Sequence, residues 1–232
     1  MSTSAPAIAR PRKSSGMLIW WLFFGLFGLM GAFVIWFSTA RPITVLPRIT
    51  LAPGFYLTDQ DGNRFTSEDL RGEIVLYNFA YTACETPCKQ TNQVMAEVQS
   101  RLPEISASVP LKLVTFSIDP TDADNLGVFA EEVGADPSVW SWATGGAPQL
   151  KSVIGGGFSV YYKQQEDGRF KLDPAFILVD GSGVIRADYR SETPDVDTIM
   201  RDFGLLSDEV DHSEGIYRFA YEAAHLFSCY PR

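Results

Sequence analysis

The chain has 232 residues, of which 46% are hydrophobic and 13% aromatic, so it can bury a core and is not intrinsically disordered. Its net charge of −9 excludes nucleic acid as an expected partner, because phosphate binding needs a basic surface. Three cysteines are too few for a scaffold of several disulfides, and any pairing leaves one thiol over. The chain has two histidines, His212 and His225.

The N-terminal part predicts a membrane anchor. Residues 1–16 are polar and carry Arg10, Arg12 and Lys13, whereas residues 17–39 contain no charged side chain. A helix that spans the bilayer core needs roughly 20 apolar residues, and the apolar region of a cleaved signal peptide has about 7–15. We therefore expect a single uncleaved transmembrane helix at 17–39. The positive-inside rule places residues 1–16 in the cytoplasm and the rest in an oxidising extracytoplasmic compartment.

The next segments are expected to connect the anchor to a folded domain. Residues 40–53 contain three prolines and no clear period, which indicates a linker or an edge strand. Residues 55–65 contain two short strand patterns separated by Asp61-Gly62, a typical hairpin turn.

The stretch from Glu73 to Gln90 is the chemical centre of the sequence. Residues 74–81 are mostly apolar, with β-branched and aromatic side chains, and predict a buried strand. Cys84 and Cys88 follow it, where a helical pattern begins. The positive end of a helix dipole favours thiolate over thiol, and a thiolate is a nucleophile and a soft metal ligand. At helical i, i+4 spacing the Cβ atoms would lie about 5–6 Å apart, so a disulfide requires Cys84 to precede the helix.

The remaining elements alternate between strands and helices, which indicates one α/β layer fold with crossover helices. Strands are predicted at 112–118, near 139–142, and at 158–162, 168–171, 175–180 and 184–189. Helices are predicted at 124–133, 148–154 (broken by three glycines) and 195–203.

The tail, residues 207–232, predicts a further helix. Asp211-x-x-Glu214 is a capping-box pattern, and the helix would run from His212 through Leu226 with Cys229 behind it. Its apolar face, which includes Phe219, should dock on the domain, and His225 lies on the polar face.

Several ordered blocks resemble the Sco/SenC family. The segment from Phe79 to Cys88, FAYTACETPC, is similar to the family's F-x-[FY]-T-x-C-x-x-x-C block. The segment from Ser117 to Pro120, SIDP, is similar to its S-[IV]-D-P block, and the 55–65 hairpin and Arg71-Gly72-Glu73 also match. The resemblance covers roughly residues 55–203 and, with the single N-terminal anchor, implies a Sco domain at 54–206.

The resemblance implies a thioredoxin-like fold and a function in copper handling. Members of the family bind copper, as Cu(I) or Cu(II), through the two motif cysteines and a distant histidine. They assist assembly of the binuclear copper site of cytochrome c oxidase, whose copper-carrying subunit would be the partner here. They deliver copper or reduce the cysteines of that site. Cys84 and Cys88 are accordingly the candidate copper ligands and the candidate redox pair.

One departure from the family opens three alternatives. The family's histidine precedes the strand that here is AFILVD, yet this chain has no histidine between Cys88 and His212. His225 and Cys229, also spaced i, i+4, can replace it as metal ligands. The two cysteines can instead hold Cu(I) alone, since thiolates select that ion. Lastly, the protein can act as a thiol–disulfide oxidoreductase that holds no copper.

Neighbouring residues bear on these alternatives. Pro174 occupies the position at which thioredoxin-like reductases place a cis-proline that faces the thiols, which favours the redox alternative. Asp119 is either a proton acceptor near the thiols or a turn residue, and Glu85 and Lys89 can tune a thiolate pKa in opposite directions. A further possibility, from another functional class, is a non-catalytic module that docks on the oxidase and has a structural disulfide.

Overall fold

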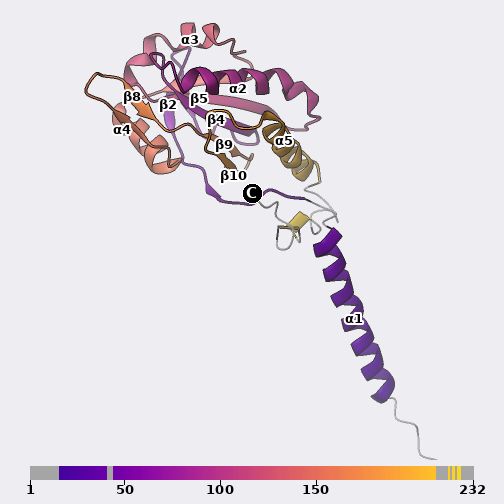
Figure 1. The fold of residues 1–232 in the computed structure, drawn as a ribbon. Coiled ribbons are helices and arrows are strands. Elements are labelled where there is room, and N and C mark those ends of the chain that lie inside the picture. The colour runs from indigo at the N-terminus through magenta and orange to yellow at the C-terminus, as the bar shows by residue number, and fades with distance from the viewer. Residues whose placement is uncertain (1–15, 41–43, 213–218, 220, 223, 226–232) are drawn as a thin grey trace, which may run out of the picture. The chain divides into compact units, whose positions relative to one another are not determined.

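The computed structural model describes residues 16–40, 44–212, 219, 221–222 and 224–225, and it divides into two units. The described residues of the first unit, Met1–Pro42, form helix α1 (Gly16–Ala40). Within it, Ile19–Trp36 is long and apolar enough to cross a membrane, as the sequence predicts, although a signal sequence near the N-terminus meets the same criterion (Figure 1). The helix is therefore a candidate membrane span.

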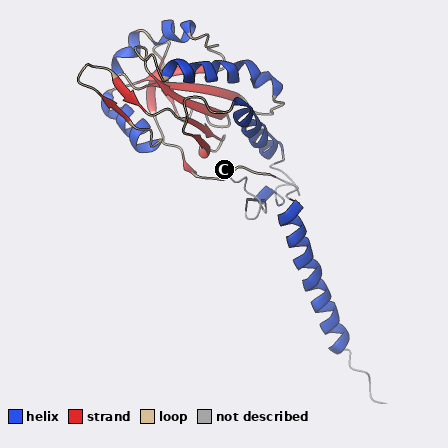
Figure 2. Cartoon of the chain, in the orientation of Figure 1, coloured by secondary structure: helices blue, strands red, loops and turns tan. Residues whose placement is uncertain are grey.

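The second unit, Ile43–Arg232, is built on an eight-stranded mixed sheet (Figure 2). Its strand order is β1-β10-β9-β4-β5-β6-β2-β3, with β4, β5 and β6 parallel and β9 antiparallel to β4. The strands of this sheet are β1 (Thr50–Leu51), β2 (Tyr56–Asp59), β3 (Arg64–Thr66), β4 (Ile74–Ala80), β5 (Leu111–Ser117), β6 (Trp140–Thr144), β9 (Phe176–Val179) and β10 (Val184–Tyr189). A separate hairpin consists of β7 (Tyr162–Gln164) and β8 (Phe170–Leu172).

Helices cover the sheet and connect its strands. They are α2 (Cys88–Arg101), α3 (Leu126–Glu132), α4 (Ala147–Leu150) and α5 (Val196–Asp211), with the 3₁₀ helices η1 (Leu102–Glu104) and η2 (Pro120–Asp124) and the π-helix η3 (Lys151–Gly157). The helices α2 and α5 pack on each other and on β4 (Figure 1). Every residue of β4 is buried, because it lies in the middle of the sheet with both faces covered. The strand that precedes the cysteines is thus the centre of the core.

The structure confirms the predicted hairpin and central strand and extends one predicted helix. The segment 40–53, predicted as a linker or an edge strand, contains β1, which pairs with β10 at the edge of the sheet, and Val45 and Leu46 are buried. The helix predicted at 195–203 continues to Asp211, so the tail that was predicted to start at 207 begins inside α5. Asp211 ends this helix instead of starting the next one, because His212 is its C-cap, and Glu214 lies outside the described residues.

Candidate functional site

The cysteine pair lies in the loop that joins β4 to α2. A turn from Tyr81 to Cys84 follows the strand and is closed by the Cys84 N–H, which donates to the Tyr81 carbonyl over 3.1 Å. Helix α2 begins at Cys88, so Cys84 precedes it. The two cysteines form a disulfide with their Cα atoms 5.7 Å apart, a separation within the normal range. Cys84 therefore precedes the helix, as a disulfide between cysteines at this spacing requires.

The two sulfur-bearing side chains differ in their access to solvent. Cys88 is fully buried and belongs to the hydrophobic core, whereas Cys84 is partly exposed and lines an open groove. An external thiol or disulfide can therefore reach Cys84 first. Cys88, as the first residue of α2, lies at the positive end of the helix dipole, where a thiolate is stabilised.

A buried carboxylate that the sequence did not single out holds the cysteine turn. Asp122 is 3% exposed and accepts hydrogen bonds from the Thr82 N–H (2.9 Å), the Thr82 hydroxyl (2.5 Å) and the Ser117 hydroxyl. Asp119 instead caps η2 by accepting from the Thr121 N–H over 2.8 Å, so it acts as the predicted turn residue. No pattern in the run 119–124 marks Asp122 as the buried member of its three aspartates.

A second anchor of the loop is the Tyr81 hydroxyl. It donates to the Phe170 carbonyl (3.0 Å) and accepts from the Phe170 N–H (3.2 Å), and the two rings pack edge to face. These contacts attach β8, and with it the segment that leads to Pro174, to the cysteine turn. The β7–β8 hairpin is thus the neighbour of the cysteine turn on this side.

The prediction of a cis-proline at Pro174 is wrong. The cis peptide bond in the described residues is Thr86–Pro87, inside the cysteine loop, and Asp173–Pro174 is trans. Trans is the ordinary state of an X–Pro bond, and the Asp173 N–H donates to the Tyr161 carbonyl in a regular extension of the β7–β8 pairing.

The structure does not bring His225 to the cysteines. Its Nε2 lies 3.0 Å from Glu209 Oε1, and Glu209 also contacts the buried Arg186, which pairs with Asp180. Asp180 follows Val179, which pairs with Val75 at the start of β4, whereas the cysteines follow the end of that strand. The seven residues of β4 separate the two places by about 20 Å.

The other predicted ligand and the other histidine give no metal site either. Cys229 lies outside the described residues. His212 stacks on Tyr221, and its Nδ1 lies 2.7 Å from the Asp208 carbonyl oxygen. Within the described ranges, no group of three or more His, Cys, Asp or Glu side chains is arranged to hold a metal ion. The cysteine pair is therefore the chemical site that this part of the chain offers.

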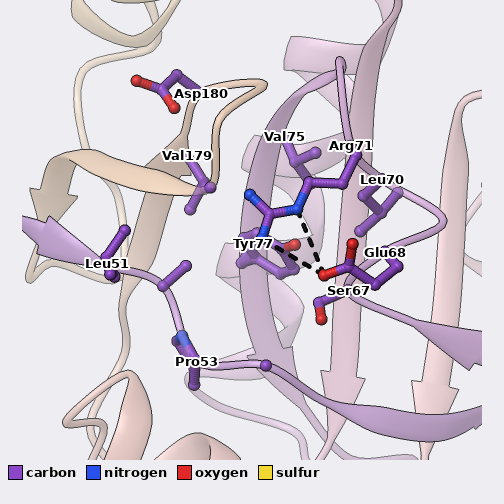
Figure 3. Close-up of a pocket in the computed structure, with 13 residues that line it drawn as sticks. Leu51, Pro53, Ser67, Glu68, Leu70, Arg71, Val75, Tyr77, Val179 and Asp180 are labelled. Carbon is purple, nitrogen blue, oxygen red and sulfur yellow. Dashed lines mark hydrogen bonds and ion pairs between the residues drawn. The ribbon is translucent and has the colours of Figure 1, made fainter.

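A separate cavity of about 120 Å³ lies near the start of β4, away from the cysteines (Figure 3). The Arg71 guanidinium lies over it, pairs with Glu68 at 3.4 Å and donates to the Ser182 carbonyl. Tyr77 extends into this region from β4, and burial raises the pKa of its hydroxyl. This cavity contains no cysteine and takes no part in the thiol site.

Comparisons with known proteins place the chain in a family. The profile of the SCO1/SenC family matches residues 46–219. A SCO1 protein homolog of Bacillus subtilis is 27% identical over 153 residues, which span 64% of this chain and 78% of the relative.

Solved structures share the fold. One of them is the structure of BsSco, a member of the Sco family of cytochrome c oxidase assembly proteins in which a disulfide switch was identified. It superposes with a TM-score of 0.61. It is 25% identical and covers 70% of this chain and 98% of its own. Arabidopsis thaliana ScoI, solved with copper bound, has a TM-score of 0.58, is 23% identical and covers 66% and 98% of the two chains. The described domain therefore has the thioredoxin-like fold of Sco proteins.

Proposed function

Because the chain belongs to the SCO1/SenC family, which is related to copper-binding cytochrome c oxidase assembly proteins, we propose that it acts in this assembly through Cys84 and Cys88. The disulfide between an accessible Cys84 and a buried Cys88, at the start of a helix, is the observation that carries the proposal. Thiol–disulfide exchange at this pair is the function that the geometry supports best.

The exchange conserves atoms and electrons. In the reduced protein the Cys84 thiolate attacks one sulfur of a partner disulfide, a mixed disulfide forms, and the first partner thiolate leaves. The Cys88 thiolate then attacks Cys84 Sγ, which releases the second partner thiolate and restores the Cys84–Cys88 bond. The partner gains two electrons and two protons, and a dithiol reductant must return them to the pair. The partner in this proposal is the oxidase subunit whose cysteines bind copper.

Copper binding by the reduced pair is the second function, and it fits the donor chemistry. Two thiolates in one loop are soft ligands that select Cu(I), and reduction of the disulfide makes both available. Copper is the cargo here and would bind to Cys84 and Cys88. A third ligand would come from Cys229, from the partner or from solvent, since His225 is held by Glu209.

The proposed location rests on α1, which is a candidate membrane span. We place α1 as a single membrane anchor with residues 1–16 in the cytoplasm and the thioredoxin-like domain outside it. A disulfide persists in such an oxidising compartment, and a reductant is needed there to prepare the pair for either function.

Trapping of the mixed disulfide tests the proposal. The reduced full-length chain in detergent would be mixed with glutathione disulfide, and adducts would be measured by mass spectrometry. Cys88→Ser should accumulate glutathione on Cys84, because the resolving thiol is gone, and Cys84→Ser should accumulate much less on the buried Cys88. Cu(I) titration of the same proteins should show binding that both substitutions abolish. Absence of both adduct and copper would contradict the proposal and favour a structural disulfide in a docking module.

A further inference from the structure

A groove of about 660 Å³ opens beside Cys84, between α2 and α3. Cys84 and Glu85 line it from the cysteine loop, Asn92 and Ala96 line it from α2, and Phe129 lines it from α3. Two helices therefore form its walls, and its lining includes Cys84, the cysteine that a partner reaches first.

One polar side chain in the groove lacks a full set of partners. Asn92 is 5% exposed, and its Oδ1 accepts from Asn78 Nδ2 over 3.4 Å. Its Nδ2 makes no hydrogen bond to any residue that the structure describes, although Asn92 lines the groove. The Asn92 Nδ2 atom keeps access to the groove and is not sealed in the core, so it can donate a hydrogen bond to an acceptor that arrives with a ligand. Asn92 is one helical turn from Cys88, on the same side of α2.

The opposite wall combines an apolar surface with a charge. The Phe129 ring packs edge to face on Trp142 with centroids 5.2 Å apart, which fixes its position, and Val133 extends the apolar surface. Glu132 lies on the same wall, is exposed, and forms no ion pair with any described residue. This wall suits a partner that carries an apolar side chain beside a basic one.

We propose that the groove binds an extended peptide segment of the protein whose cysteine reacts with Cys84, an inference that rests on the proposed exchange function. A disulfide places its two Cα atoms about 4.4–6.8 Å apart, so the partner's cysteine lies at the groove beside Cys84 during the reaction. The adjoining backbone carbonyl accepts from Asn92 Nδ2. A large apolar side chain contacts Phe129, and an arginine or lysine pairs with Glu132.

Peptide disulfides test this proposal on the reduced full-length chain in detergent. Each probe peptide has one cysteine joined by a disulfide to thionitrobenzoate. In the first peptide leucine and arginine flank the cysteine on both sides, and in the second the flanking residues are glycine. Attack by the Cys84 thiolate releases thionitrobenzoate, which is followed by absorbance, and Cys88 then displaces the peptide thiolate. We expect the first peptide to react about tenfold faster than the second.

Matched variants separate the groove from the thiol chemistry. Asn92→Ala and Glu132→Gln should each reduce the preference between the peptides to about threefold or less. Glu131→Gln is the control, because it removes the same charge from the next residue of α3, outside the groove lining. Equal rates for the two peptides, or a full preference in both groove variants, would overturn the inference. No reaction with either peptide or with the symmetric thionitrobenzoate disulfide would instead contradict the proposed exchange function.

Discussion

Asp122 binds Thr82, two residues before Cys84, with both of its carboxylate oxygens. Oδ2 accepts from the Thr82 N–H at 2.9 Å, and Oδ1 accepts from the Thr82 hydroxyl at 2.5 Å. The turn that carries Cys84 is therefore fastened to the loop after β5, and the position of the accessible sulfur depends on a side chain 38 residues away in sequence. The contacts of Asp122, Tyr81, Arg186 and Glu209 each lead to a testable prediction.

Removal of the Asp122 carboxylate should destabilise the domain. Asp122→Ala leaves the Thr82 N–H and hydroxyl without their acceptor and leaves the Ser117 hydroxyl only the Asp119 carbonyl at 3.4 Å, which should lower the free energy of unfolding by about 3 kcal/mol. Urea unfolding of the oxidised protein measures the change. Asp124→Ala, a neighbouring exposed aspartate, is the control and should cost less than about 0.5 kcal/mol. Equal effects of the two substitutions would contradict the role given to Asp122.

The Tyr81 hydroxyl should fix the β7–β8 hairpin to the cysteine turn. Tyr81→Phe removes both hydrogen bonds to Phe170 but keeps the ring contact, so we expect a loss of about 1 kcal/mol and faster hydrogen exchange at the Phe170 amide. Tyr161→Phe, an exposed tyrosine beside the same hairpin, should change neither quantity. Unchanged exchange at Phe170 in Tyr81→Phe would show that the hydroxyl does not hold the hairpin.

The guanidinium of Arg186 should be required for stability at the other end of the sheet. It is almost completely buried and bonds to Asp180, Glu209 and the carbonyls of Leu46 and Pro47. Arg186→Met removes the ion pair of Asp180 and leaves Glu209 only Arg48 and His225, so it should cost about 3–5 kcal/mol in urea unfolding. Arg64→Met, an exposed arginine over the Tyr56 ring, is the control and should cost below about 1 kcal/mol. A small effect of Arg186→Met on the free energy of unfolding would contradict the stabilising role given to Arg186.

The ionisation of Glu209, beside Arg186, should make the free energy of unfolding depend on pH at low pH. Burial by itself raises the pKa of Glu209, but hydrogen bonds from His225 and Arg186 and the charge of Arg186 outweigh it and lower the pKa to about 2. A carboxylate with a lowered folded-state pKa stabilises the protein above its ordinary value of 4.5, and this stabilisation disappears as the pH falls toward 2. It amounts to about 3 kcal/mol.

Comparison of two variants isolates the contribution of Glu209. The free energy of unfolding of the wild type should fall steeply between pH 4.5 and 2. Glu209→Gln should reduce this dependence on pH. Asp208→Asn, at the adjacent exposed residue, should leave the slope as in the wild type. An identical slope in wild type and Glu209→Gln would contradict the lowered pKa.

Local sequence patterns predicted the parts of the fold that depend on neighbours in the chain. The run at 74–80, apolar except for Asn78, is a central strand because both of its faces are covered, and Asp61-Gly62 forms the turn of a hairpin. Cys84 precedes the helix, as a disulfide at this spacing requires. The partners from distant segments were not predictable, because Asp122 differs from Asp119 and Asp124 only in what the folded chain brings to it.

The tail shows why a helical wheel alone misleads. The wheel places Phe219 on the docking face and His225 on the solvent face, yet Phe219 is 76% exposed and the His225 side chain is 11% exposed. The surface that the tail meets presents Arg48 and Glu209, so charged and polar contacts hold it: Glu222 pairs with Arg48, and His225 contacts Glu209. An apolar-face argument assumes an apolar partner surface, whereas Glu222 and His225 contact charged side chains.

The reduction potential of the Cys84–Cys88 bond tests the central claim most directly. The full-length chain would be equilibrated with glutathione or dithiothreitol buffers, and the free thiols counted by alkylation and mass spectrometry. A pair that exchanges with partner cysteines should have a potential above about −300 mV, in the range of known thiol–disulfide exchange proteins. A potential well below about −300 mV would mark the bond as an inert structural bridge and would contradict the account.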